Sequence, residues 1–241
     1  MPPLEQLKLR STLPGEVAYT DDQFYGARAL FHDGPPAGHP SAEDVRWLRP
    51  AQVCEAVGAP APALFVDSSS SSDVVQGALG DCWFLSALGV VALQPELLSR
   101  VFSRWEESPA GGKCTFVFHY EGEWRPITID DRLPCHTNGR LLYARAATIN
   151  EMWVPLVEKA YAKLHGSYEA LVSGFADTAL RHLTGGASQR RTVRASDGDG
   201  SAADELWARL TSWTAERSPV GCAHSRAVAQ RLRAEAERAG T

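Results

Sequence analysis

The segment QGALGDCWFLSALGVVA, from Gln76 to Ala92, constrains the fold more than any other stretch of this 241-residue chain. Its first part is a glutamine followed by small residues and two glycines, which is typical of a tight turn. From Cys82 onward almost every residue is apolar, which predicts a buried helix. The segment therefore predicts a turn that leads a cysteine to the N-terminus of a core helix.

A cysteine at that position has two alternative roles. Cysteine is a common core residue that often only fills space, but a packing cysteine needs no glycine-rich turn before it. A helix N-terminus favours the thiolate form of a cysteine, which is the nucleophilic form. The amide of Gln76 and the backbone N–H of Cys82 could together stabilise a developing oxyanion. The pattern favours acyl-transfer chemistry at Cys82, whereas packing remains the interpretation for Cys54, Cys114, Cys135 and Cys222.

Composition excludes several classes of function. The net charge of −5 provides no basic surface for nucleic acid. The N-terminus lacks the apolar stretch of a signal peptide, and no window is apolar for the ~18 residues that a membrane span needs. Five cysteines without a CxxC pair indicate free thiols in a reducing, cytoplasmic setting. Scattered cysteines and histidines do not fit a zinc site.

The rest of the chain mixes helices with a small antiparallel sheet. Residues 1–45 are rich in Pro, Gly and Asp and predict a loop-rich arm on the surface of a body. Helices are expected after Pro50, after Pro95, over Asn150–Gly166 as an amphipathic helix, and over Glu205–Arg217. Alternating residues around Glu121 and Gly122 predict a β-hairpin, and Ser218–Ser225 is a candidate short strand. The fold class is therefore α+β.

Three consecutive charges follow the predicted hairpin. Asp130, Asp131 and Arg132 could in principle supply an acid and a base. Their position at a hairpin end favours a structural role with a local ion pair.

Several motifs together resemble one known family. QGALGDCWFLSAL is similar to the nucleophile segment of calpains, which are papain-like intracellular cysteine proteases. The resemblance extends to four other segments in the family's order and at similar spacing: VRWLRPAQVC, DDRLP, WVPLVEKAYAKLHGSYEAL and LTGG. It covers roughly Asp22 to Cys222.

The resemblance implies the fold and the roles of three residues. Cys82 matches the nucleophile, Gln76 matches the oxyanion-stabilising glutamine, and Trp83 matches a structural tryptophan. The chain would form the first, cysteine-bearing lobe of a papain-like protease, with a central buried helix that starts at the cysteine and a small antiparallel sheet. The expected organisation is an arm over residues 1–21, the first lobe over 22–222, and an atypical tail over 223–241.

The family's catalytic histidine and asparagine have no match. They lie in GHAY-like and NPWG-like contexts in calpains, and neither string occurs here. Only His224 falls in the window of about 130–150 residues after the cysteine that is typical of papain-type enzymes, and its GCAHS context does not resemble the family's. Three interpretations stay open: a fragment of a longer protease, a lobe completed by a second lobe in cis or in trans, or a short non-proteolytic relative.

The resemblance also implies a Ca²⁺ site, because calpain lobes bind calcium. Asp73 and Glu151 match the family's carboxylate ligands, and Val66 and Ser68 match the residues that offer backbone carbonyls. Oxygen ligands from a loop are what Ca²⁺ accepts. The alternative is that Asp73 caps a turn and Glu151 is a charge stabilised at a helix N-terminus.

Two functions follow from these observations. The first is a calcium-dependent cysteine endopeptidase that cuts intracellular protein substrates at a limited number of sites. The second keeps the fold without turnover, as a calcium-responsive binding or scaffold module.

Overall fold

The computed structural model describes residues 3–10, 17–32, 34–35, 39–66, 73–105, 111–191 and 200–222. The chain divides into two compact units, residues 1–192 and 193–241. Each unit is described separately below, and the first holds all the candidate site residues of the nucleophile segment. Among the described residues, no helix has both the length and the apolar content needed to cross a membrane.

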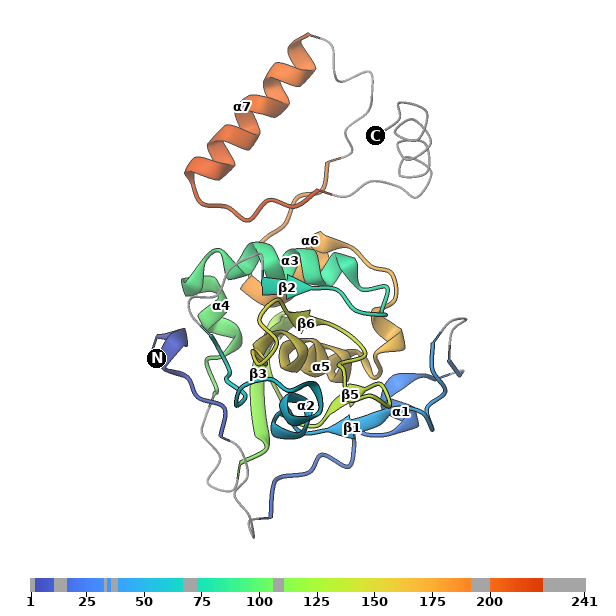
Figure 1. Cartoon of the computed structure of the whole chain (residues 1–241). Coiled ribbons are helices and arrows are strands. Elements are labelled where there is room, and N and C mark those ends of the chain that lie inside the picture. The colour runs from blue at the N-terminus through green and yellow to red at the C-terminus, as the bar shows by residue number, and fades with distance from the viewer. Residues whose placement is uncertain are drawn as a thin grey trace, which may run out of the picture. The chain divides into compact units, whose positions relative to one another are not determined.

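The first unit combines short strands with helices of four to thirteen residues (Figure 1). Its helical elements are η1 (Leu4–Gln6), α1 (Ala27–Leu30), α2 (Pro50–Val57), α3 (Cys82–Ala92), α4 (Pro95–Val101), α5 (Trp153–His165), η3 (Glu169–Leu171) and α6 (Ala176–Thr184). Its strands are β1 (Arg46–Leu48), β2 (Val74–Val75), β3 (Lys113–Tyr120), β4 (Glu123–Asp130), β5 (Leu133–Cys135) and β6 (Arg145–Ala146).

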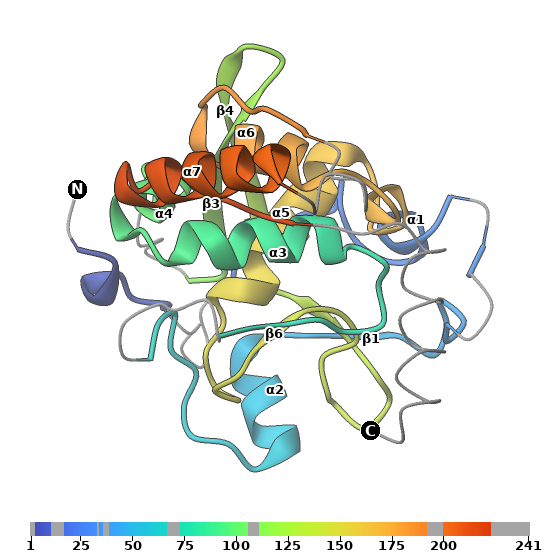
Figure 2. The same ribbon diagram turned by 90° about the horizontal axis from the view of Figure 1, so that it is seen from above.

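The described strands form antiparallel pairs, β1 with β5, β2 with β6 and β3 with β4. In the last pair Cys114 lies opposite Ile129, and both side chains are buried. The turn between β3 and β4 has positive φ at Glu121 (52°) and Gly122 (85°), the backbone that two-residue hairpin turns require. Figure 2 shows the turn of this hairpin extending beyond α3 and α6 of the same unit. The predicted hairpin and the α+β fold are confirmed.

Proline and glycine set the ends of several helices as expected. Pro50 opens α2 and Pro95 opens α4, where a missing N–H costs nothing. Gly58 ends α2 in the left-handed conformation with φ at 67°. The helices expected after these prolines are therefore confirmed.

Helix α5 is the centre of the first unit (Figure 1). It begins at Trp153 rather than at Asn150, and its residues 153–162 are all buried. The elements β3, β4, β5, β6 and η3 all lie against it, and Phe84 of α3 stacks on Tyr161 with ring centroids 4.0 Å apart. The expected amphipathic helix is therefore confirmed, but over residues 153–162 its polar side is buried as well, because neighbouring elements cover it.

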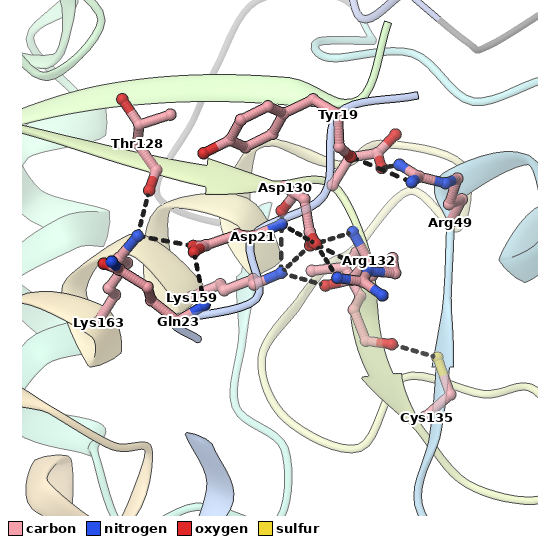
Figure 3. Close-up of polar contacts among 12 residues, drawn as sticks. Tyr19, Asp21, Gln23, Arg49, Thr128, Asp130, Arg132, Cys135, Lys159 and Lys163 are labelled. Carbon is pink, nitrogen blue, oxygen red and sulfur yellow. Dashed lines mark hydrogen bonds and ion pairs between the residues drawn. The ribbon is translucent and has the colours of Figure 1, made fainter. Parts of the chain in front are cut away.

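A network of buried charges fixes the hairpin to α5 (Figure 3). The Lys159 ammonium donates to an Asp130 carboxylate oxygen at 2.5 Å, and both side chains are fully buried. The Arg132 guanidinium donates to the other Asp130 oxygen at 2.7 Å. Burial alone would raise the pKa of Asp130, but Lys159 and Arg132 outweigh it and hold the pKa below its usual value. These contacts support the structural role expected for Asp130, Asp131 and Arg132.

The same network holds the N-terminal arm and α2. The backbone N–H of Asp21 donates to Asp130 at 2.9 Å, and Lys163 donates to the Asp21 carboxylate at 2.7 Å. Arg49, the residue before α2, pairs with buried Asp131. The arm thus lies on the body through charges as well as through buried apolar side chains such as Leu7 and Phe24.

The second unit contains one described helix, α7 (Ser201–Ala215), which confirms the helix expected around Glu205–Arg217. Residues 218–222 carry no strand, so the strand expected from Ser218 is not found in the described part of that segment. His224 lies outside the described residues.

Candidate active site

The turn that leads to Cys82 is anchored by backbone hydrogen bonds on two sides. The Ala78 N–H donates to the Leu142 carbonyl at 3.1 Å, and the Ser173 N–H donates to the Gly80 carbonyl at 3.1 Å. The His39 ring is 2.8 Å from the Ala78 carbonyl through Nε2. Segments far apart in sequence therefore fix the path of residues 76–82.

Gly77 is required by close approach and not by backbone bending. A Cβ built on Gly77 would lie 2.1 Å from the Tyr143 carbonyl oxygen, which is far inside van der Waals contact. The chain bends over residues 78–80, as the glycine-rich segment predicted, although neither Gly77 nor Gly80 has a positive φ. At Gly80 a Cβ would meet only a Val172 methyl at 3.4 Å, an ordinary contact.

Gln76 lies directly after β2 and is exposed. Its amide nitrogen donates to the Leu79 carbonyl at 2.7 Å, within the same turn. A primary amide has two N–H donors, so one remains available for another acceptor while the first fixes the side chain. This arrangement suits an oxyanion donor held in place by its own loop.

Cys82 is the first residue of α3 and is exposed, whereas Phe84 and Leu85 that follow it are buried. The carbonyl of Asp81, the N-cap, accepts from the Phe84 N–H at 2.8 Å, which starts the helix at this point. The first N–H groups of a helix have no partner within it. The structure thus places an exposed thiol beside unsatisfied backbone donors at the helix entrance.

Trp83 ties the start of α3 to the chain that follows α5. Its indole N–H donates to the Leu171 carbonyl at 2.7 Å. Gly174 lies against the indole so closely that a Cβ there would be 2.3 Å from the ring. These contacts support the structural role expected for Trp83.

The other thiols differ from Cys82 in exposure. Cys54, Cys114 and Cys135 are buried, and burial raises the pKa of each thiol, that of Cys135 to about 12. A thiol that stays protonated is a poor nucleophile. Cys222, in the second unit, is exposed, so the packing role expected for it is wrong. Packing accounts for the three buried cysteines.

A second group of residues meets around the segment before α5. The Val66 N–H donates to the Glu151 carboxylate at 2.9 Å, and Glu151 is buried. The Met152 N–H donates to the Ala63 carbonyl at 2.9 Å, so residues 63–66 run beside the start of α5. The Ala147 N–H donates to the Asp73 carbonyl at 2.9 Å. Val66 and Glu151 are therefore directly bonded, Asp73 is bonded to Ala147, four residues before Glu151, and Ser68 lies outside the described residues.

Comparison with known proteins decides the family. A family model described as calpain family cysteine protease matches residues 19–239. The chain is 40% identical to the calpain-type cysteine protease DEK1 of Arabidopsis thaliana over 212 residues, which are 86% of this chain. It is 37% identical to calpain-10 of Macaca fascicularis over 82% of the chain, and 38% identical to calpain-8 of Homo sapiens over 73%.

The chain belongs to the calpain family of cysteine proteases. It spans about 10% of the length of the Arabidopsis relative, 30% of the macaque calpain-10 and 25% of the human calpain-8. The architecture around Cys82 agrees with the cysteine-bearing lobe of a calpain protease core, with α3 starting at the cysteine and small antiparallel sheets.

A calpain nucleophile needs a base, and the described residues of this chain provide no histidine bonded to Cys82. Two histidines are hydrogen-bonded to Tyr161 instead. His182 Nδ1 is 2.8 Å from the Tyr161 hydroxyl, and His165 Nδ1 is 2.9 Å from the Tyr161 carbonyl. Burial lowers the pKa of both, that of His182 to about 4. They are packing histidines.

The calcium-ligand residues expected of a calpain lobe fit Ca²⁺ by their chemistry. Two carboxylates and a backbone carbonyl are hard oxygen donors, the kind that Ca²⁺ prefers. Among the described residues, no group of three or more His, Cys, Asp or Glu side chains is arranged to hold a metal ion. Any site here must therefore draw on backbone oxygens as well as on Asp73 and Glu151.

Sequence reasoning missed two buried acids beside the nucleophile. Asp81, directly before Cys82, is fully buried, and Glu158 of α5 is 1% exposed. Their carboxyls interact, although 77 positions separate them in the chain. The available hint was the charged pair Glu158 and Lys159 inside the otherwise mainly apolar stretch 153–162 of α5.

Proposed function

We propose that this chain is the cysteine-bearing half of a calcium-dependent calpain-type endopeptidase that performs limited proteolysis of intracellular proteins. The observation that carries the proposal is the exposed Cys82 thiol at the first turn of α3, on the same anchored turn as Gln76. In the proposed reaction the Cys82 thiolate attacks a peptide carbonyl carbon, and a tetrahedral oxyanion forms. The Cys82 N–H and the Gln76 amide stabilise that oxyanion.

The proton of the thiol must leave through a base, and the leaving amine must receive a proton. A histidine oriented by an asparagine performs both transfers in papain-like enzymes. We propose that this pair comes from a second lobe, in cis or in trans. The substrates would be cytoplasmic proteins, a setting in which the five thiols of the chain stay reduced.

Labelling with a thiol-directed peptide epoxide tests the nucleophile. We expect selective modification of Cys82, a large reduction in Q76A, which lacks the amide donor, and none in C82S. Cys222 is the internal control, because its thiol is also exposed but does not belong to the turn that carries Gln76. Equal labelling of Cys82 and Cys222 would contradict a primed nucleophile.

The proposal includes a Ca²⁺ site in this lobe. Asp73, Glu151 and the carbonyls of Val66 and Ser68 would hold the ion, which would neutralise the two carboxylates and tie residues 63–66 to the start of α5. Calorimetry should detect Ca²⁺ binding that is lost in D73A and in E151Q. Glu55→Gln, which changes an exposed glutamate of α2, is the matched control. Binding that survives in both site variants would remove the calcium site.

The alternative is a calcium-responsive binding or scaffold module without turnover. The observation that favours it is that no described histidine reaches Cys82. Mixing the chain with a separately produced histidine-bearing calpain lobe separates the two functions. Calcium-dependent cleavage of an unfolded protein substrate, abolished by C82S, supports the enzyme. Calcium-dependent association without cleavage supports the module.

A further inference from the structure

The side chain of Asp81 is unusual for an N-cap residue. It makes no hydrogen bond to the helix it precedes, although N-cap aspartates usually accept from the first turn. Its carboxyl is fully buried, and neither oxygen has a hydrogen-bond partner of standard geometry among the described residues. The group beside it is the carboxyl of Glu158. The Asp81 side chain is therefore directed into the core behind Cys82.

Glu158 approaches Asp81 from the central helix. Both of its oxygens are 3.1 Å from the Ala144 N–H, the single backbone donor that this carboxyl has. Tyr143 and Tyr168 line a small cavity together with Glu158, and their buried hydroxyls have no hydrogen-bond partner of standard geometry among the described residues. Besides burial and the carboxyl pair, two further acidic groups raise the pKa values of these hydroxyls: Glu169 raises that of Tyr143, and Cys135 raises that of Tyr168.

Two ionised carboxylates are not stable in this environment. The described groups that act on the pair are carboxyls, tyrosine hydroxyls and the backbone N–H groups of Ala144 and Asp81, and no cation is among them. Like charges that share a buried site cannot both ionise, so one carboxyl keeps its proton. A protonated carboxyl donates through its O–H, and that bond would join α3 to α5.

We propose that Asp81 and Glu158 are positioning residues that share a proton, and that the O–H···O bond between them fixes the N-terminus of α3, with Cys82, against α5. The proposal rests on the proposed function only in taking Cys82 as the nucleophile. The shared proton also limits negative charge next to the thiol, which would otherwise disfavour the thiolate.

The ionisation of the pair agrees with this arrangement. Burial raises the pKa of Asp81 to about 6, and burial together with the Asp81 charge raises the pKa of Glu158 well above its usual value. The pair therefore holds two protons in mild acid and one proton near neutrality. The loss of the first proton adds one negative charge behind Cys82.

Infrared spectroscopy of the full chain tests whether the proton is present. At neutral pH the wild-type protein should show the carbonyl stretch of a buried protonated carboxyl. That band should disappear in the isosteric double variant D81N/E158Q and persist in E55Q, the same chemical change at an exposed site. A band that survives in D81N/E158Q, or that is absent from the wild type, overturns the proposal.

The second readout is the rate at which iodoacetamide alkylates Cys82 relative to Cys222, resolved by mass spectrometry between pH 5 and pH 8. In the wild type this ratio should fall several-fold as the pair loses its first proton. In D81N this fall should be absent, because the amide keeps the hydrogen bond to Glu158 but has no proton to lose. The truncation E158A should lower the wild-type rate of Cys82 modification, and E158Q should restore it.

Identical profiles in the wild type, D81N and E55Q would overturn the positioning role even if the variants fold normally. Neither readout requires peptide cleavage. If the band and the pH effect are found but a peptide epoxide does not select Cys82, the proposed protease function fails and the carboxyl pair stands.

Discussion

Two clusters of buried charge hold this lobe together, and they do so by opposite means. Around Asp130 each acid meets a base: Lys159 and Arg132 bind its two oxygens, and Arg49 pairs with Asp131. Behind Cys82, Asp81 meets another acid, Glu158. Burial acts on both clusters, but the pKa of Asp130 is lowered and that of Asp81 is raised. Neutralisation comes from lysine and arginine in one case and from a proton in the other.

The Asp130 network is a contact that does not depend on pH near neutrality, whereas the Asp81–Glu158 contact does. Lys159 of α5 and Arg132, just after β4, keep Asp130 neutralised over the physiological pH range, and the Asp21 N–H binds the same carboxylate, so the hairpin, the arm and α5 stay joined. The carboxyl pair depends on the proton concentration of its surroundings. The lobe thus has a constant scaffold far from the nucleophile and a proton-dependent contact directly behind it.

The largest expected effect comes from breaking the scaffold. Lys159→Met removes the fully buried cation of Asp130, and a buried charge that loses its partner typically costs about 3–5 kcal/mol. Urea unfolding at neutral pH measures the loss. Lys113→Met, on the exposed side of β3, is the control. A loss no greater than that of the control would mean that Arg132 alone neutralises Asp130.

A smaller effect, with a defined pH dependence, is expected from Asp81→Asn. The folded-state pKa of Asp81, about 6, lies above its ordinary value of 3.8, so the folded state binds more protons than the unfolded state. The stabilisation that this proton provides is complete below about pH 4 and is lost as the pH rises through about 6. The free energy of unfolding of the wild type should fall by about 2–3 kcal/mol relative to D81N across that window.

Asp130 should behave in the opposite way. Its folded-state pKa is lowered, so its contribution is present at neutral pH and is lost as the pH falls through that pKa. Unfolding curves of D81N and of Asp130→Asn over the same pH series would sharpen the comparison. Parallel curves for the two variants would contradict it.

The smallest of the three effects is expected from Arg49→Met. The Arg49 side chain is 21% exposed, so water already reaches it, whereas Asp131 is buried. We expect a loss of about 1–2 kcal/mol at neutral pH. The loss should shrink in acid, because burial raises the pKa of Asp131 and the carboxyl can protonate without its partner. Arg125→Met, which breaks an exposed pair with Glu121, should cost well under 1 kcal/mol and is the control.

Local sequence determined much of this fold. The turn-to-helix transition at Cys82, the helices that open with Pro50 and Pro95, and the hairpin at Glu121 and Gly122 all follow from residue types within a few positions. Each depends on backbone preferences of proline and glycine, or on a run of apolar residues. Such features can be predicted without knowing what lies across the core.

The carboxyl pair and most of the ion network could not be predicted in this way. Asp130 and Arg132 are two positions apart, and their pairing was expected, but Lys159 lies 29 residues from Asp130 and Asp21 lies 109. The charges of α5 were taken as evidence of a polar face. Glu158 and Lys159 are instead buried. Their partners, Asp81 and Asp130, come from elements distant in sequence.

Gly77 has a practical consequence for altering this protein. Any side chain at that position would have to displace the Tyr143 backbone, which precedes the Ala144 N–H that Glu158 binds. Mutant libraries intended to reshape the surface beside Cys82 should therefore keep position 77 as glycine and diversify exposed Ala78 and Gly80 instead. Position 77 tolerates only the hydrogen atom of glycine, whereas positions 78 and 80 of the same loop can accept larger side chains.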